Sequence, residues 1–390
     1  MPTARPVVRS LPTAEAEALL ELTRDLVEHE VAPLAEPMEA REEFPRELFR
    51  TVGKAGLLGL AYPEEYGGGG QPYEVYLQVL EELGRGWAGF AVGVSVHTLA
   101  CFPVAQWGSD AQRERFLPDM LAGDLLGAYC LSEAGSGSDA AALVTRATLD
   151  GTDYVVDGAK AWVTHGGHAD FYNLMVRTGS PGADGAGPHG ISCLLAASDT
   201  PGLLPQPPEK KMGMRSAHTA TIVLDGARDP ADRLIAGEGE GFRIAMSALD
   251  GGRLGIAAVA VGLAQAALDL AVSYATERRQ FGSTIASFQG MEFLLADLAT
   301  QVEAARALYL SAARLHDAGK PYGPQASMAK LFATDTCMRV TTDAIQVLGG
   351  AGYVEDYPAE RYFREAKVMQ IFEGTNQVQR IVIGRSLTRS

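Results

Sequence analysis

The chain has 390 residues, of which 47% are hydrophobic and 21% charged, a composition typical of a globular protein with two or three domains or one composite unit. The net charge of −15 argues against a nucleic-acid partner, because nucleic-acid binding favours a basic surface. No unbroken apolar run approaches the ~20 residues that span a bilayer, so we expect no membrane association.

Cysteine usage and the N-terminus bear on location. Cys101, Cys130, Cys193 and Cys337 lie far apart without a C-x-x-C pair, so we expect buried thiols in a reducing compartment rather than disulfides or metal ligands. Residues 1–10 faintly resemble an organellar transit peptide, but they are short and interrupted by proline, which favours a disordered tail. The expected location is therefore cytoplasmic.

Residues 1–126 have a helical pattern and are predicted to form an N-terminal helical domain. The segment 14–32 predicts one amphipathic helix, with Thr13 as its N-cap and Pro33 just after its end. Pro45 can occupy the start of the next helix, which ends before Gly56. Further helices are predicted at 73–83, 90–107 and 110–121, the last with Asp110 as its cap.

Residues 127–237 change to short β-prone runs separated by turn residues, which predict a small β-barrel or sandwich. Asp150-Gly151 and Asp157-Gly158 flank an apolar run and predict a hairpin. Other strands are predicted at 159–164, 171–177, 190–196 and 219–224, with a surface loop at 179–190.

Residues 238–390 predict a C-terminal four-helix bundle, with long amphipathic helices at 253–278, 288–318, 324–348 and 358–370. The expected fold class is therefore mainly α with a central β domain. Helices of this length favour an oligomer, because an apolar stripe beyond the needs of one bundle must be covered.

An acid near the C-terminus, Glu373, follows an apolar run and precedes Gly374 and Thr375. Apolar surroundings disfavour a charged carboxylate and raise its pKa toward the range of a general base. Glycine at 374 would let the backbone approach a ligand closely. A helix that simply ends at Glu-Gly is the alternative, and the segment alone leaves both interpretations open.

Two segments of the β region carry groups suited to a ligand. The segment 128–139 runs into a Gly/Ser turn rich in N–H and hydroxyl donors, which suits an anionic or carbonyl-rich ligand edge. It lacks the lysine of a phosphate loop, and no G-x-G-x-x-G follows a strand, so a Rossmann unit is not expected. Trp162 and Thr164 would flank a flat ring and bond one of its nitrogens, unless Trp162 is a core residue.

Other polar clusters have simpler alternatives. Asp250 to Arg253 would begin a long helix and favour an anion, or only cap the helix. Arg278 beside Phe281 suits a pyrophosphate, or belongs to a solvated charge run. The glycines after residue 348 could form a C-cap. His165 and His168 could suggest a metal, but the Gly-Gly between them favours a turn, and we expect no metal site.

Together and in this order, these segments resemble the acyl-CoA dehydrogenase family of flavoenzymes from about residue 15 to the end. The most specific segments are 129–139, 162–167, 278–282, 346–350 and 373–377. The resemblance implies FAD as cofactor, a saturated acyl-CoA of short to medium or branched chain as substrate, and a role in fatty acid β-oxidation. It also implies a homotetramer or homodimer that passes electrons to electron-transfer flavoprotein.

The resemblance assigns roles residue by residue. It implies that Glu373 is the catalytic base. Around the flavin it places Tyr129, Cys130, Leu131, Ser132, Gly137, Ser138, Trp162, Val163, Thr164, Thr375, Asn376 and Gln377. Toward the FAD of a neighbouring subunit it places Arg278, Gln280, Phe281, Gln289, Gln346, Val347, Leu348, Gly349 and Gly350. In the substrate site it places Ser138, Asp250, Arg253, Phe372 and Gly374.

The implied reaction is an α,β-dehydrogenation. Glu373 would take the α-proton while its backbone N–H and a flavin hydroxyl polarise the thioester carbonyl. The β-carbon would transfer a hydride to flavin N5, leaving a trans-2-enoyl-CoA. Some relatives place the base near Gly252, which has no side chain here, and this favours Glu373.

Three alternatives keep the same fold. The acyl chain could be carried by acyl carrier protein in secondary metabolism. The protein could be a flavin-bearing assembly partner with little turnover, against which Glu373 and the flavin motifs argue. It could also be an oxidase that reacts with oxygen.

Overall fold

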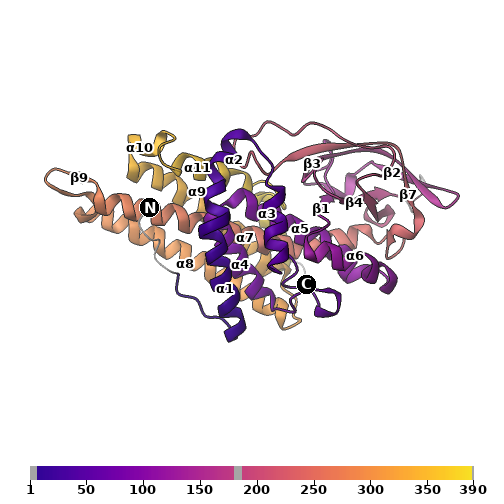
Figure 1. Ribbon diagram of the computed structural model, residues 1–390, viewed down its shortest axis with the longest axis horizontal. Coiled ribbons are helices and arrows are strands. Elements are labelled where there is room, and N and C mark those ends of the chain that lie inside the picture. The colour runs from indigo at the N-terminus through magenta and orange to yellow at the C-terminus, as the bar shows by residue number, and fades with distance from the viewer. Residues whose placement is uncertain (1–6, 180–186, 389–390) are drawn as a thin grey trace.

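The computed structural model describes residues 7–179 and 187–388, so part of the predicted tail and most of the predicted loop at 179–190 lie outside the described residues. Along the chain, a helical part, a sheet and a part with long helices follow one another, as predicted (Figure 1). The sheet lies at one end of the molecule, and the long helices extend to the other end.

The N-terminal helices are α1 (Ala14–Leu26), α2 (Ala32–Arg41), α3 (Arg46–Lys54), α4 (Tyr73–Gly86), α5 (Ala88–Trp107) and α6 (Asp110–Ala122). Thr13 caps α1, as predicted, by accepting a 3.1 Å hydrogen bond from the Ala16 N–H. The prediction that this helix ends before Pro33 is wrong, because a π-helical turn at Val27–Val31 joins α1 to α2. This wider turn accommodates the proline ring, which would clash with a regular turn before it.

The cap of α6 is Ser109 rather than the predicted Asp110. Ser109 Oγ accepts a bond from the Gln112 N–H at 3.2 Å, and Gln112 Oε1 accepts one from the Ser109 N–H at 2.9 Å. This reciprocal capping box satisfies two backbone donors at once. Asp110 instead forms an ion pair with Arg113.

The central strands are β1 (Gly127–Cys130), β2 (Arg146–Asp150), β3 (Asp153–Thr164), β4 (Phe171–Arg177), β5 (Ile191–Ala197), β6 (Leu203–Pro205), β7 (Thr219–Pro230) and β8 (Leu234–Ile235). They form one sheet in the order β6-β7-β3-β2-β4-β5-β8, with β1 parallel to β4. The hairpin predicted at Gly151 is confirmed, since Asp150 pairs with Asp153. A turn at Gly158 is not formed, because Gly158 lies inside β3 at a shift of register against β7.

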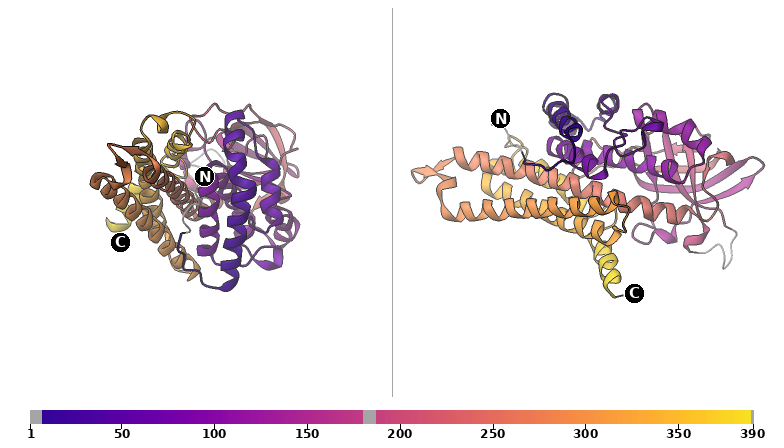
Figure 2. Two further views of the ribbon diagram at one scale, coloured as in Figure 1. Left: turned by 60° about the vertical axis from the view of Figure 1, so that its left-hand side comes forward. Right: turned by 90° about the horizontal axis from the view of Figure 1, so that it is seen from below.

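The C-terminal helices are α7 (Gly241–Glu277), α8 (Gln289–Asp317), α9 (Gly323–Leu348), α10 (Gly350–Tyr353), α11 (Ala359–Met369) and α12 (Asn376–Thr388), with the hairpin β9 (Arg279–Gln280) and β10 (Ser283–Thr284) after α7. The prediction that a helix begins near Asp250 is wrong, because α7 starts at Gly241 and runs through Gly251 and Gly252. Buried apolar positions on both sides of these glycines keep the helix continuous. In Figure 2, α12 extends away from the long helices.

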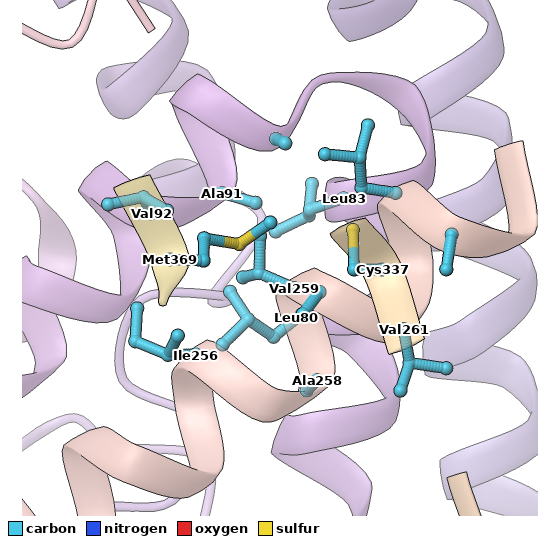
Figure 3. Close-up of a cluster of buried hydrophobic side chains, with 14 of the residues drawn as sticks. Leu80, Leu83, Ala91, Val92, Ile256, Ala258, Val259, Val261, Cys337 and Met369 are labelled. Carbon is cyan, nitrogen blue, oxygen red and sulfur yellow. The ribbon is translucent and has the colours of Figure 1, made fainter. Parts of the chain in front are cut away.

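One large apolar core joins the first and last parts of the chain. Leu80 and Leu83 of α4 and Val92 of α5 lie in it with residues of α7, α9 and α11 (Figure 3). Helices α4 and α7 approach so closely that a Cβ at Gly262 would lie 2.2 Å from the Glu81 carbonyl oxygen. Glycine is therefore required at this crossing.

Two core helices, α5 and α7, are long and apolar enough to span a membrane by length and composition. The expectation from the sequence missed them, because glycines and single polar residues interrupt the apolar runs without lowering the mean hydropathy much. Most of both helices is buried inside the protein, as in the core helices of a globular fold. The four cysteines are buried free thiols, as predicted.

Residues 7–10 are ordered against the rest of the protein, which corrects the expectation of a disordered tail for these residues. The buried Arg9 guanidinium donates to Glu81 and Glu82 on α4, with the shortest contacts at 2.9 and 3.0 Å. Arg306 of α8 also pairs with Glu81, at 3.0 Å. These contacts neutralise two carboxylates that burial would otherwise disfavour.

Replacement of Gly262 by alanine tests the close crossing of α4 and α7. We expect Gly262→Ala to lower the free energy of unfolding by about 1–3 kcal/mol, because the new methyl group meets backbone atoms. A matched control is Gly384→Ala in α12, where a Cβ would meet no other atom within 4 Å and stability should stay equal or rise. Thermal unfolding measures both, and equal midpoints would contradict the prediction.

Candidate active site

Glu373 lies in the short turn between α11 and α12, in an unusual backbone conformation. Its φ is +54° and that of Gly374 is +84°, so two successive residues adopt the left-handed region. The Glu373 Oε2 atom is buried and has no hydrogen-bond partner among the described residues. A Cβ at Gly252 would lie only 2.8 Å from this oxygen, so α7 presents a bare backbone to the carboxylate.

Burial raises the pKa of Glu373 to about 7, while the positive charges of Arg253 and Lys330 lower it. The carboxylate is thus poised to accept a proton near neutral pH. Glu373 also contributes to the raised pKa values of Tyr73 and Tyr129, which burial mainly causes. Helix α4 and strand β1 therefore both lie near the base.

A small cavity of about 80 Å³ lies where α4, α5 and α7 meet, and Gly252 is part of its wall. Its lining mixes apolar and hydroxyl-bearing side chains, among them Tyr73, Tyr76, Ser95 and Leu99. The Tyr73 hydroxyl donates to the Gly251 carbonyl at 3.0 Å, which fixes this wall. Gly252 therefore connects the wall of this cavity with the Glu373 carboxylate.

Asp250 and Arg253 lie on the wall of α7 next to the base, within the helix rather than at its N-terminus. The predicted contribution of a helix dipole therefore does not apply to them. Arg253 pairs with Asp250 at 2.5 Å and is buried, but its Nε atom has no partner within the described ranges. The guanidinium thus keeps one donor for a ligand.

The Gly/Ser turn after β1 lies beside the strand that carries Trp162. The Ala161 N–H of β3 donates to the Ser132 carbonyl at 2.9 Å, so the two segments predicted for the flavin come together. Sequence reasoning missed the pair that holds this turn: buried Lys160 contacts Glu133 at 2.8 Å. Glu133 also accepts bonds from the backbone N–H groups that lead into β2.

The surface of this region fits a flat ring. Trp162 has a φ of +55° and is 57% exposed, so the core alternative for this residue is wrong. Val163 points into the sheet core, and the Cys130 side chain is likewise buried, so both can offer a ligand only their backbone groups. A Cβ at Gly137 would meet no atom within 4 Å, which leaves the turn open to a large cofactor.

A second group of predicted cofactor residues lies far from the base. Arg278 caps the end of α7, and Gln280 and Phe281 lie in the hairpin that follows it, at the opposite end of the molecule from the sheet (Figure 1). Phe281 is 95% exposed at the tip. Gln289 is also exposed and begins α8, and the segment 346–350 ends α9, with Val347 and Leu348 buried. A single chain therefore does not bring the two predicted sets together.

The segment after the base is fixed within the chain. The Asn376 side chain donates to Thr334 Oγ1 and Asp335 Oδ1, so it is committed to α9. Thr375 Oγ1 accepts the Val378 N–H, and Gln377 remains exposed. Lys330 and Gln379 donate hydrogen bonds to the turn itself. These two residues were not identified from the sequence.

The predicted turn at His165 and His168 is present, and its side chains bond other protein groups. His165 Nδ1 contacts the Gly127 carbonyl at 2.8 Å, and His168 Nε2 contacts His218 Nδ1 at 2.8 Å. Within the described residues, no cluster of three potential metal ligands occurs.

A carboxylate with a buried, unpartnered oxygen near a small cavity, together with an exposed Trp162 and an open turn that suit a flat ring, fits an enzyme of the flavin-dependent oxidoreductase class. Profiles of the acyl-CoA dehydrogenase N-terminal, middle and C-terminal domains match residues 13–124, 128–227 and 239–388. The chain belongs to the acyl-CoA dehydrogenase family, whose members depend on FAD.

Individual relatives are similar over nearly the whole chain. An acyl-CoA dehydrogenase of Bacillus subtilis is 44% identical, over 96% of this chain and 98% of its own. The mitochondrial short-chain specific acyl-CoA dehydrogenase of Rattus norvegicus is 40% identical, over 98% and 93%. The structure of butyryl-CoA dehydrogenase from Megasphaera elsdenii has a TM-score of 0.94 at 39% identity, covering 98% of this chain and 100% of that one.

Replacement of Arg278 by alanine tests the distant half of the cofactor site. We expect Arg278→Ala to weaken FAD affinity about ten-fold or more, through loss of a charge-assisted contact to the pyrophosphate. Arg279→Ala removes the neighbouring guanidinium, which bonds the Gly282 carbonyl, and serves as the matched control. FAD affinity is measured by reconstitution of the apoprotein, and equal affinities in both variants would exclude this role of Arg278.

Proposed function

We propose that the protein oxidises short, saturated acyl-CoA thioesters to trans-2-enoyl-CoA, with Glu373 as the base. The observation that carries the proposal is the Glu373 carboxylate, whose Oε2 atom is buried and has no partner in the described residues. Its pKa of about 7 and its place beside the cavity suit removal of a weakly acidic α-proton. A desolvated carboxylate is also a stronger base than one in water.

The backbone of the same residue provides the second group that the reaction needs. Within the part of the chain that the structure describes, the Glu373 N–H donates no hydrogen bond. It is therefore available to polarise the thioester carbonyl, which acidifies the α-proton. Bound FAD supplies the hydride acceptor for the β-carbon. Glu373 thus combines a proton acceptor with a carbonyl-binding donor.

The size of the cavity supports a short acyl chain. The cavity is small, at about 80 Å³, and Tyr73, Tyr76 and Leu99 form part of its wall. The names of two relatives, butyryl-CoA dehydrogenase and short-chain specific acyl-CoA dehydrogenase, agree with this range. We therefore place butyryl-CoA ahead of octanoyl- and palmitoyl-CoA as a substrate.

The separation of the two cofactor segments supports a homo-oligomer. The hairpin β9–β10 lies at the opposite end of the molecule from the sheet, whose strand β1 leads into the other predicted cofactor segment, so a neighbouring subunit would have to supply the second set. Exposed aromatic residues on the hairpin and α8, Phe281 and Phe293, agree with a covered surface. A homotetramer, electron-transfer flavoprotein as acceptor, a role in β-oxidation and a cytoplasmic location complete the proposal.

Anaerobic titration of the holoprotein tests the substrate class. Butyryl-, isobutyryl-, octanoyl- and palmitoyl-CoA are added in turn while the flavin absorbance near 450 nm (a general flavin property) is followed. We expect butyryl-CoA to bleach the flavin fastest, because the cavity is small. Faster bleaching by palmitoyl-CoA would contradict the chain-length proposal. If only acyl-carrier-protein thioesters bleached the flavin, the acyl chain would be carried by acyl carrier protein and not by CoA.

Replacement of Glu373 by glutamine tests the base. We expect Glu373→Gln to keep FAD and to lose more than ~10³-fold in the rate of flavin reduction, the scale of a lost general base. Glu365→Gln is a matched control, since Glu365 is also buried with its pKa raised to about 7 but lies inside α11 and pairs with Arg361. Near-normal reduction by Glu373→Gln would assign the base to another residue.

A further inference from the structure

The turn that carries Glu373 requires support from its surroundings. A non-glycine residue in the left-handed region costs about 1–2 kcal/mol relative to a regular conformation. Glu373 adopts it at φ +54°, directly before Gly374 at φ +84°. Contacts with neighbouring elements must therefore hold the turn in place, and the structure shows two such contacts.

Lys330 of α9 provides the first contact. Its ammonium group donates to the Gly374 carbonyl at 2.8 Å and to Asn376 Oδ1 at 2.9 Å. The Lys330 side chain is fully buried, which is rare for lysine unless it is paired or functional. The lysine thus holds the turn and the first residue of α12 together.

Gln379 of α12 provides the second contact. Its side-chain amide donates to the Glu373 carbonyl at 3.2 Å and to the Gly374 carbonyl at 2.9 Å. Gln379 is fully buried as well. Both carbonyl groups of the strained turn are therefore held by buried donors from two different helices.

We propose that Lys330 and Gln379 are positioning residues that fix the Glu373–Gly374 turn, and that the Lys330 charge, together with that of Arg253, lowers the proton affinity of the proposed base. The inference rests on the proposed function of Glu373 and deepens it. With both carbonyls held, the Glu373 N–H and carboxylate keep fixed directions toward the site. Gln379 contributes geometry alone, whereas Lys330 contributes geometry and charge.

The charges around the base define what Lys330 can do. The cations that face Glu373 are Arg253 from α7 and Lys330 from α9, and the hydroxyls of Tyr73 and Tyr129 approach from α4 and β1. Lys330 in turn faces Glu373, Asp335 and Arg253. Burial lowers the pKa of Lys330 to about 8, so it still carries its charge near neutral pH.

Removal of each donor separates the two roles. In the wild type, kcat/KM should rise with pH through the Glu373 pKa of about 7, because the ionised carboxylate is the active form. Lys330→Met removes the neighbouring cation, and this loss favours the protonated form of Glu373. The rising limb of the kcat/KM–pH profile should therefore move up by about one pH unit, and kcat should fall. Gln379→Leu should lower kcat and leave the limb in place.

Hydrogen–deuterium exchange of the holoenzyme measures the turn without substrate. Peptides covering residues 371–379 should exchange faster in Lys330→Met and in Gln379→Leu than in the wild type. Lys54→Met, which removes an exposed lysine on α3, is the control and should match the wild type in both measurements. Lys330→Arg keeps the charge, so its kcat/KM should rise over the same pH range as in the wild type. This variant still tests the charge if Lys330→Met fails to retain FAD.

Two results would overturn the inference. Unchanged exchange of the turn in both Lys330→Met and Gln379→Leu would exclude a holding role. The proposed role of the Lys330 charge would be excluded if the pH dependence of kcat/KM stayed unchanged in Lys330→Met, or if it shifted in Lys330→Arg. If no acyl-CoA reduces the wild-type flavin, the proposed function fails, and the exchange measurement still decides whether these residues hold the turn.

Discussion

The desolvation of one carboxylate determines the arrangement of the active site. Glu373 keeps an oxygen buried with no partner among the described residues, which is costly for an ionised group. The protein tolerates it because Arg253 and Lys330 offset part of the cost and because Gly252 leaves room for the carboxylate. Helices α7 and α9 and the strained turn therefore shield the proposed base from water and hold it in place.

The same demand explains why the core joins distant parts of the chain. The base comes from the end of the chain, its bare wall from the middle of α7, and the cavity from α4 and α5. Only a continuous core can hold these elements in register, and the close crossing at Gly262 shows how tightly α4 and α7 pack. The packing of α4 against α7 therefore supports the active site, even at positions far from Glu373.

The sequence predicted the elements well where local patterns decide them. Helical periodicity and cap residues such as Thr13 predicted most helices, and the Asp-Gly turn predicted the hairpin after β2. Errors arose where distant packing overrides a local signal. The chain stays helical past Pro33 by means of the π-helical turn that precedes it. Helix α7 continues through Gly251 and Gly252 because the helix is buried before and after these glycines.

The candidate site was predictable in its residue types but not in its supports. The position of Glu373 after an apolar run indicated a base with a raised pKa. Lys330 and Lys160 showed no such signal, because a lysine inside a helix or strand pattern normally faces solvent. Their burial follows from carbonyls and carboxylates brought to them by segments far away in sequence, which no local pattern contains.

Comparison of two buried acids shows that a raised pKa does not by itself identify a base. Burial raises the pKa of both Glu365 and Glu373 to about 7. Glu365 lies within α11 and pairs with Arg361 at 3.1 Å, whereas Glu373 lies on a strained turn beside Gly252 and the cavity. The pKa values of the two acids are similar, so the role proposed for Glu373 rests on its access to a substrate. Backbone geometry, maintained by buried donors, gives Glu373 that access.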